Sequence, residues 1–218
     1  PEILNIAKFG NINVHPSLLP KYRGASPIQS AILSGDQETG ITIILMDELM
    51  DHGPILSQQG VALTGHETAD ALHKELAEVG KDLLIKTIKQ LFENAITPQP
   101  QNHDSATYCK IIKKDNAKIN WDNSAQTIER QIRAYYSWPT AWTAYSDKRL
   151  KIFPPAKILD DIRSKKPGEV FLFNNQLAIA CGQDDAIVIS SIQLEGHPQM
   201  NTDNFLRGNK EILNQTLD

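Results

Sequence analysis

The sequence predicts an α/β domain followed by a small, mostly β domain, and four features of its 218 residues carry this prediction. Residues 39–46 are apolar and β-branched, as in a buried strand, and residues 68–94 repeat apolar side chains at helical spacing. A linker rich in proline and glutamine follows at 97–107. Toward the C-terminus the apolar period changes to two, which is typical of a small barrel or sandwich. We therefore expect domains over 1–96 and 108–218.

The first domain begins with a short predicted helix over residues 2–8 and a buried strand over 11–15. Ser26 and Pro27 have the residue types of an N-cap and a first helical position, and Gly35 ends this helix. The chain extends again over 54–63, and Thr68 caps the long helix. One buried stripe of that helix is predicted to contain Leu72, Leu76, Val79, Leu83, Ile88, Leu91 and Phe92.

In the second domain Ser124 caps a predicted helix that carries Ile128, Ile132 and Tyr135 on one side. Turn-forming residues then separate short segments of alternating polarity. A last short helix is predicted over 201–207. The expected strands lie near 141–145, 149–158, 169–173, 177–181 and 186–194.

The composition, with 40% hydrophobic and 22% charged residues, is that of an ordinary globular protein. Its apolar runs are far shorter than a membrane span, and no charged-then-apolar leader opens the sequence, which favours a cytoplasmic location. Cys109 and Cys181 are too few and too isolated for a disulfide framework or a zinc ribbon. The histidines lack metal-ligand spacing, so no metal is expected.

Charge is distributed unevenly along the chain, whose net charge is −4. Residues 107–166 contain 13 Lys and Arg against 6 Asp and Glu, whereas the rest of the chain is acidic. Such a block indicates either a polyanionic partner or a solvated basic face. Trp138 and Trp142 lie within it and are more typical of domain-core anchors than of base-stacking platforms. The candidate phosphate contacts are Lys110, Lys113, Lys114, Lys118, Arg130, Arg133, Lys148, Arg149 and Lys151.

An asparagine and a histidine stand two residues apart at the end of the strand predicted over 11–15. Side chains on a strand alternate between its faces, so Asn13 and His15 point the same way. Two prolines and a glycine then shape a tight loop over 16–24. We expect both side chains at the carboxyl end of a parallel sheet, where open α/β sheets bind ligands. A buried asparagine and histidine are also common as satisfied structural groups.

A carboxylate beside this pair would hold the histidine tautomer and favour its charged form. Asp51 is the candidate, because it follows the strand predicted over 39–46 and its loop ends at Gly53-Pro54. Asp47, on the same loop, is the competing carboxylate. Arg23 either braces the loop or contacts a substrate anion, and the bracing role is favoured.

The run Asn-Val-His-Pro-Ser-Leu-Leu-Pro-Lys-Tyr-Arg-Gly over 13–24 resembles the signature of the formyltransferases that depend on 10-formyltetrahydrofolate. Within that family it is most similar to the methionyl-tRNA formyltransferases. The similarity continues through residues 25–29, 40–42 and 46–56, and it resumes more loosely in the C-terminal half.

This resemblance implies a Rossmann-like catalytic domain, of which residues 1–96 are the C-terminal part, and an OB-like β-barrel that binds tRNA. The resemblance assigns Asn13, His15 and Asp51 as catalytic residues, and it favours Asp51 over Asp47. It also implies that 10-formyltetrahydrofolate donates the formyl group without a metal. The implied folate-binding residues are Ser17, Leu18, Leu19 and Pro20, and the implied tRNA contacts are Lys113, Lys114, Lys148 and Arg149.

The resemblance further implies that the first half of the catalytic domain lies upstream, so the 218 residues alone are expected to have negligible activity. The implied reaction formylates the amino group of initiator methionyl-tRNA, with neither a membrane nor DNA as partner. Two alternatives remain, a sugar-nucleotide formyltransferase and a non-catalytic tRNA-binding fragment. A hydrolase that passes the formyl group to water is a further candidate, whereas glycinamide ribonucleotide formyltransferase lacks a C-terminal barrel.

Overall fold

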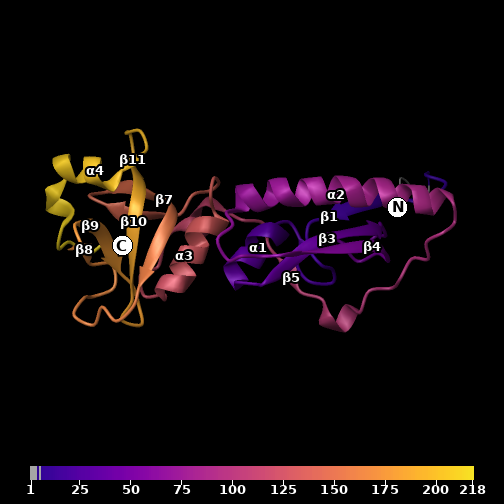
Figure 1. Cartoon of the computed structure of the whole chain (residues 1–218), viewed down its shortest axis with the longest axis horizontal. Helices are drawn as coiled ribbons and strands as arrows, with labels where there is room; N and C mark the ends of the chain where they lie inside the picture. The colour runs from indigo at the N-terminus through magenta and orange to yellow at the C-terminus, as the bar shows by residue number, and fades with distance from the viewer. Residues whose placement is uncertain (1–3, 5) are drawn as a thin grey trace. The chain divides into compact units, whose positions relative to one another are not determined.

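A computed structural model of the chain describes residue 4 and residues 6–218. The chain divides into two compact units, Pro1–Ile112 and Lys113–Asp218 (Figure 1). The segment predicted as a linker, 97–107, thus lies within the first unit. The helix predicted over 2–8 falls partly outside the described residues, and its described part over 6–8 forms turns and a bend.

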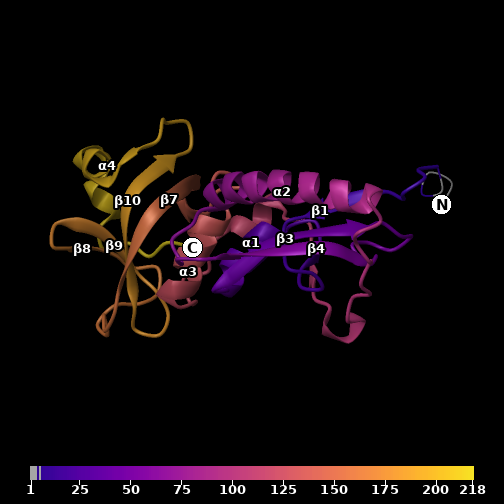
Figure 2. The same ribbon diagram turned by 45° about the vertical axis from the view of Figure 1, so that its right-hand side comes forward.

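The first unit contains a three-stranded sheet in the order β1-β3-β4. Helix α2 runs along this sheet in both ribbon views and packs on β3 and β4 (Figures 1 and 2). A separate pair of short strands, β2 and β5, lies parallel. The elements are β1 (Ile12–His15), β2 (Arg23–Gly24), α1 (Pro27–Ser34), β3 (Glu38–Leu45), β4 (Ile55–Ala62), α2 (Ala69–Phe92), the 3-10 helix η2 (His103–Ser105) and β5 (Tyr108–Cys109).

In this unit, the predicted bounds of α1 and the predicted N-cap of α2 are confirmed. Pro27 is the first residue of α1, and Gly35 ends it in the left-handed conformation, with φ 68°. The Thr68 hydroxyl accepts a hydrogen bond from the Ala71 N–H and caps α2.

Helix α2 buries the first part of its predicted stripe but not the end. Leu72, Leu76 and Leu83 are buried, whereas the Phe92 side chain is 59% exposed. The prediction was wrong for Phe92, whose ring instead meets that of Phe9 edge to face at 4.9 Å. Among the described residues, no helix combines the length and the apolar character needed to cross a membrane.

The prediction of a parallel sheet was wrong for these three strands, because β1 pairs antiparallel with β3 and β3 pairs antiparallel with β4. A parallel pair needs a crossover that carries the chain back along the sheet. The 46–54 connection contains no helix and closes a hairpin. Helix α1 has 8 residues and rises about 12 Å, well short of the roughly 26 Å that the 8 residues of β3 span.

The second unit is built on a six-stranded antiparallel sheet in the order β6-β7-β10-β9-β8, with β11 beside β10. All five strands predicted here are present. The elements are the 3-10 helix η3 (Lys114–Ala117), α3 (Ala125–Ala134), β6 (Trp142–Tyr145), β7 (Lys148–Leu159), β8 (Val170–Phe173), β9 (Gln176–Ala180), β10 (Ala186–Leu194), β11 (Met200–Asn201), α4 (Thr202–Gly208) and the 3-10 helix η4 (Lys210–Ile212).

The expected barrel is a curled sheet that stays open, since no pairing joins β6 to β8 within the described residues (Figure 1). A register shift between Ile189 and Ser191 interrupts the β10–β7 ladder and favours bending. Helix α3 covers the sheet with Ile128 and Ile132, which were predicted to share one side of the helix and are both buried. The core of this unit is therefore made from its own residues.

Candidate active site

The structure brings together the three residues predicted to be catalytic. The Asn13 side-chain amide donates a hydrogen bond to Asp51 Oδ1 at 3.1 Å. His15 Nδ1 lies 3.6 Å from the same oxygen. Antiparallel pairing explains why Asp51 lies near Asn13 and His15. It places the end of β3 beside the start of β1, and the loop over 46–54 that follows β3 brings Asp51 back to Asn13. One carboxylate oxygen thus faces both side chains.

The second ring nitrogen of His15 fixes the tautomer. Nε2 lies 3.0 Å from the Tyr22 carbonyl oxygen, which can only accept, so Nε2 carries the hydrogen. In the neutral ring, Nδ1 then has a lone pair and faces Asp51. Burial lowers the pKa of His15, and the Asp51 carboxylate and the Tyr22 carbonyl offset this only in part. The neutral ring can therefore accept a proton at Nδ1, where Asp51 would stabilise the resulting charge.

Asp51 is held through both carboxylate oxygens. Its Oδ2 accepts a hydrogen bond from the Gly24 backbone N–H at 2.8 Å, while Oδ1 faces Asn13 and His15. Gly24 has φ 116°, and a Cβ there would overlap the Cys109 carbonyl oxygen. Glycine at 24 therefore lets β2 and β5 pair closely while its amide points at the carboxylate.

The competing carboxylate, Asp47, has a different partner. Its Oδ2 lies 2.6 Å from His52 Nδ1. Burial alone would raise the pKa of Asp47, but hydrogen bonds from His52 and from the Leu49 N–H outweigh it and hold the pKa below its ordinary value. Of these two carboxylates, it is Asp51 that the structure pairs with His15.

The loop predicted to bind folate is tied to β3. The Thr42 hydroxyl donates to the Ser17 carbonyl at 2.6 Å and accepts from the Leu19 N–H at 3.0 Å. The Ser17 hydroxyl donates to the Lys21 carbonyl at 2.6 Å. Because Ser17 and Leu19 are buried, their side chains shape the loop, whereas Leu18 and Pro20 are half-buried and reach the surface. Leu18 lines a surface hollow of about 530 Å³.

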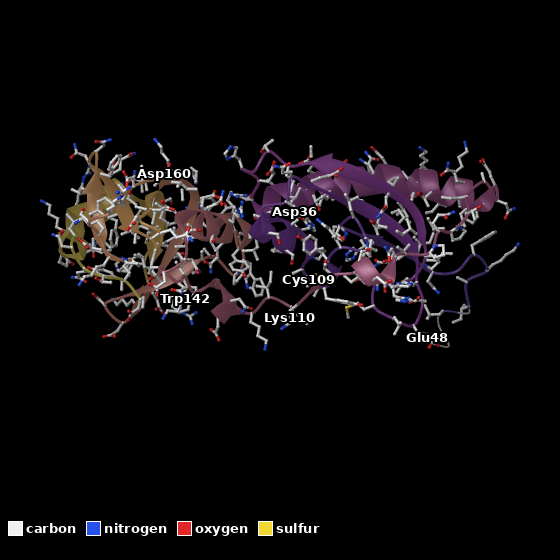
Figure 3. All side chains as sticks on the ribbon, turned by 90° about the horizontal axis from the view of Figure 1, so that it is seen from below. Asp36, Glu48, Cys109, Lys110, Trp142 and Asp160 are labelled. Carbon is white, nitrogen blue, oxygen red and sulfur yellow. The ribbon has the colours of Figure 1, made fainter. Side chains whose placement is uncertain are left out.

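The predicted tRNA contacts lie in the second unit, and all four side chains are exposed. Two of these residues contact Trp142, which is labelled in Figure 3. The indole N–H donates to the Lys114 backbone carbonyl at 3.4 Å, and the Arg149 guanidinium lies over the indole ring, 4.5 Å from its centroid. Lys148 and Arg149 are adjacent at the start of β7, and Lys113 precedes η3. Trp142 therefore connects residues from two separate parts of the basic block.

Several residues that complete the site were not predicted. Tyr22 and Gly24 contribute backbone groups, and backbone groups leave no mark on residue type. Gln101 was assigned to a linker because prolines surround it, yet it is buried. Arg23 is 1% exposed and bonds to Gln101, which agrees with the bracing role. Among the residues that the structure describes, no group of three His, Cys, Asp or Glu side chains could hold a metal ion.

Two models of known families match the chain, "Formyl transferase" over residues 1–88 and "Formyl transferase, C-terminal domain" over residues 111–210. Among solved structures, HypX from Aquifex aeolicus in complex with tetrahydrofolic acid is similar, with a TM-score of 0.68 and 19% identity over 91% of this chain and 35% of HypX. The Helicobacter canadensis N-formyltransferase in complex with folinic acid and dTDP-3-aminofucose has a TM-score of 0.65 and 24% identity, over 82% of this chain and 65% of that one.

A much stronger similarity in sequence relates the chain to a curated bacterial enzyme. The methionyl-tRNA formyltransferase of Carboxydothermus hydrogenoformans is 41% identical over 219 residues, which cover 100% of this chain and 70% of the relative. Both units of the chain take part in this match. The chain therefore belongs to the methionyl-tRNA formyltransferase family.

Proposed function

We propose that the chain transfers the formyl group of 10-formyltetrahydrofolate to the amino group of initiator methionyl-tRNA, as part of translation initiation. The observation that carries the proposal is the Asp51 carboxylate shared by Asn13 and His15. A neutral amide donor and a proton-accepting imidazole beside a carboxylate are suited to acyl transfer between nitrogens. These three side chains also suit the formyl group of a folate, because its carbonyl is neutral and accepts a hydrogen bond from a neutral donor.

Each of the three side chains has a role in this chemistry. An amide nitrogen carries two N–H bonds, of which Asn13 gives one to Asp51, so the second can donate to the formyl oxygen as negative charge develops there. His15 Nδ1 accepts the proton that the attacking amine loses, and Asp51 stabilises the imidazolium. The bond from the formyl carbon to the acceptor nitrogen forms, the bond to the folate nitrogen breaks, and the proton passes to that nitrogen.

Ser17, Leu18, Leu19 and Pro20 form the folate-binding loop in this proposal. The hydrogen bonds to Thr42 keep the loop in one conformation, and Leu18 and Pro20 supply the accessible apolar surface. Lys113, Lys114, Lys148 and Arg149 bind tRNA phosphates, since all four are exposed cations and salt-sensitive phosphate contacts dominate nucleic-acid affinity.

A sugar-nucleotide acceptor is the second candidate, because the fold is shared with an N-formyltransferase whose complex contains dTDP-3-aminofucose. The test supplies 10-formyltetrahydrofolate with initiator methionyl-tRNA, with a nucleotide-linked amino sugar, or with no acceptor. It is run on the chain alone and with the part of the Carboxydothermus relative that the chain does not cover, added as a separate polypeptide. We expect formyl-methionyl-tRNA when that polypeptide is added and negligible product from the chain alone, whereas formylation of the sugar alone would overturn the proposal. Formate released without an acceptor would indicate a hydrolase.

A further inference from the structure

Segment 99–103 runs antiparallel beside the loop that carries Asp51. Gln99 and Ile55 exchange both backbone hydrogen bonds at 2.8 Å. Two residues further on, the contact is made by the Gln101 side chain. Its amide nitrogen donates to the Gly53 backbone carbonyl at 2.7 Å and to the Asp51 backbone carbonyl at 2.9 Å. Gln101 therefore bonds the backbone on both sides of His52.

The same segment contacts the loop a second time through His103, two residues after Gln101. The ring of His103 stacks on that of His52, with centroids 4.0 Å apart and an angle of 1° between the planes. His52 is in turn hydrogen-bonded to Asp47. Because both contacts involve residues 47–53, segment 99–103 holds this loop by backbone and side chain together.

Arg23 fixes which way the Gln101 amide points. The Gln101 side-chain oxygen accepts from Arg23 Nε at 3.2 Å and from Nη2 at 2.6 Å. Arg23 Nη2 also lies 2.9 Å from His103 Nδ1, which must accept because a guanidinium only donates. With its oxygen held by a cation, Gln101 can present only N–H groups to the two loop carbonyls. Gln101 is 5% exposed and Arg23 1%, so water cannot readily replace these bonds.

The loop needs this support because Asp51 has φ 50°, a left-handed conformation that costs free energy outside glycine. Its side chain must nevertheless reach three partners at once, Asn13, His15 and the Gly24 amide. A displacement of about 1 Å in a reacting or orienting group can lower a rate about a hundredfold.

We propose that Gln101, oriented by Arg23, is a positioning residue that holds the backbone of Asp51 and thereby sets its carboxylate against Asn13 and His15. Its importance for the rate rests on the proposed formyl transfer, while its effect on Asp51 does not. The side-chain hydrogen bonds of Gln101 go to the Asp51 and Gly53 backbone carbonyls and to Arg23, and not to the side chains of Asn13, His15 or Asp51.

The test variant is Gln101→Glu, which keeps an oxygen for Arg23 and replaces the two N–H donors with a second oxygen facing carbonyls. The matched control is Gln99→Glu, the same change at an exposed side chain two residues earlier that does not bond the loop through its amide. The reporter is hydrogen exchange at the Gly24 amide, because its N–H bonds directly to the Asp51 carboxylate. Amides of β3 report whether the sheet stays folded.

We expect Gln101→Glu to speed exchange at Gly24 about tenfold or more, the effect of losing a hydrogen bond to a carboxylate, with β3 protection and the control unchanged. In the formylation assay we expect kcat to fall about ten- to a hundredfold, with the KM for tRNA within about twofold. Unchanged Gly24 exchange in Gln101→Glu overturns the proposal. If β3 also loses its protection, Gln101→Glu has disturbed the sheet as a whole. Gln101→Met, which adds no charge, then replaces it, and exchange at Gly24 is again compared with exchange in β3 to test the proposal.

The two proposals fail separately. A chain that formylates no methionyl-tRNA even with the uncovered part of the Carboxydothermus relative added, but whose Gly24 amide responds to Gln101→Glu, would refute the proposed function and support the positioning role. A chain that formylates methionyl-tRNA at the normal rate in Gln101→Glu, with Gly24 unaffected, would do the reverse.

Discussion

The charge state of His15 depends on two opposing effects at a single residue. Burial lowers its pKa below the ordinary 6.5, and the Asp51 carboxylate raises it again in part. The ring is therefore neutral at pH 7 and ready to accept a proton. A lowered pKa in the folded state also means that, below about pH 6.5, the unfolded chain binds the proton first, so stability is lost as the pH falls.

The expected loss of stability with falling pH can be tested without any substrate. Between about pH 7.5 and about pH 5.5, the free energy of unfolding should fall more for the wild type than for His15→Gln, whose side chain does not titrate. Urea unfolding at the two pH values measures the difference. Equal losses in both proteins would show that His15 is not held in its neutral form. In the formylation assay, the acid limb of kcat/KM, which reports the free enzyme, should correspondingly lie below pH 6.5.

The choice between the two carboxylates is also decided at single residues. Asp51→Asn should lower kcat by about two to three orders of magnitude, comparable to Asn13→Ala or His15→Ala, because each removes a group from the charge-stabilising set. Asp47→Asn is the matched control and should cost far less, since Asp47 pairs with His52. Steady-state kinetics of the folded variants compare them. A larger loss in Asp47→Asn than in Asp51→Asn would exchange the two roles.

At the scale of elements, local signals in the sequence predicted what local physics determines. Ser124 and Thr68 cap their helices, Pro27 begins α1, Gly35 ends it, and five of the six strands of the second sheet were placed, β11 being the exception. These features depend on residue type within a few positions. Their prediction therefore required no knowledge of the tertiary structure.

Strand direction was predicted wrongly, and the outer partners of the site leave no local signal. The sheet was expected to be parallel by analogy with open α/β sheets, although the nine residues over 46–54 are fewer than the dozen or more that a parallel crossover needs. Phe92 continues the apolar stripe in sequence, but its side chain is largely exposed and its ring contacts that of Phe9. Gln101 contacts residues about fifty positions away, and its neighbouring prolines indicate only a loop. Residue types, together with the resemblance to a known family, predicted the chemical groups of the candidate site, while long-range packing determined how they are held.

At the scale of the whole chain, the proposed catalytic residues and the four predicted tRNA contacts belong to different units. Asn13, His15 and Asp51 all lie in Pro1–Ile112, and the four predicted tRNA contacts all lie in Lys113–Asp218. The core of the second unit, from Ile119 to Leu217, is made only of residues from that unit. Charge changes on its surface should therefore alter nucleic-acid affinity without altering the geometry around Asp51.

Replacing Lys113, Lys114, Lys148 and Arg149 together by glutamine tests this separation. Each phosphate contact releases counterions and contributes about 0.9 to the slope of log affinity against log salt for duplex nucleic acid. Loss of all four contacts should therefore flatten the slope by up to about 3.6 and raise the KM for tRNA, with folate binding unchanged.

The charge-matched control replaces four exposed lysines of α2 in the first unit, Lys74, Lys81, Lys86 and Lys89. If tRNA affinity and its salt slope change equally in both variants, attraction by overall charge is sufficient. The basic block would then be only a solvated face, whereas a loss confined to the first variant would make it the tRNA-binding surface.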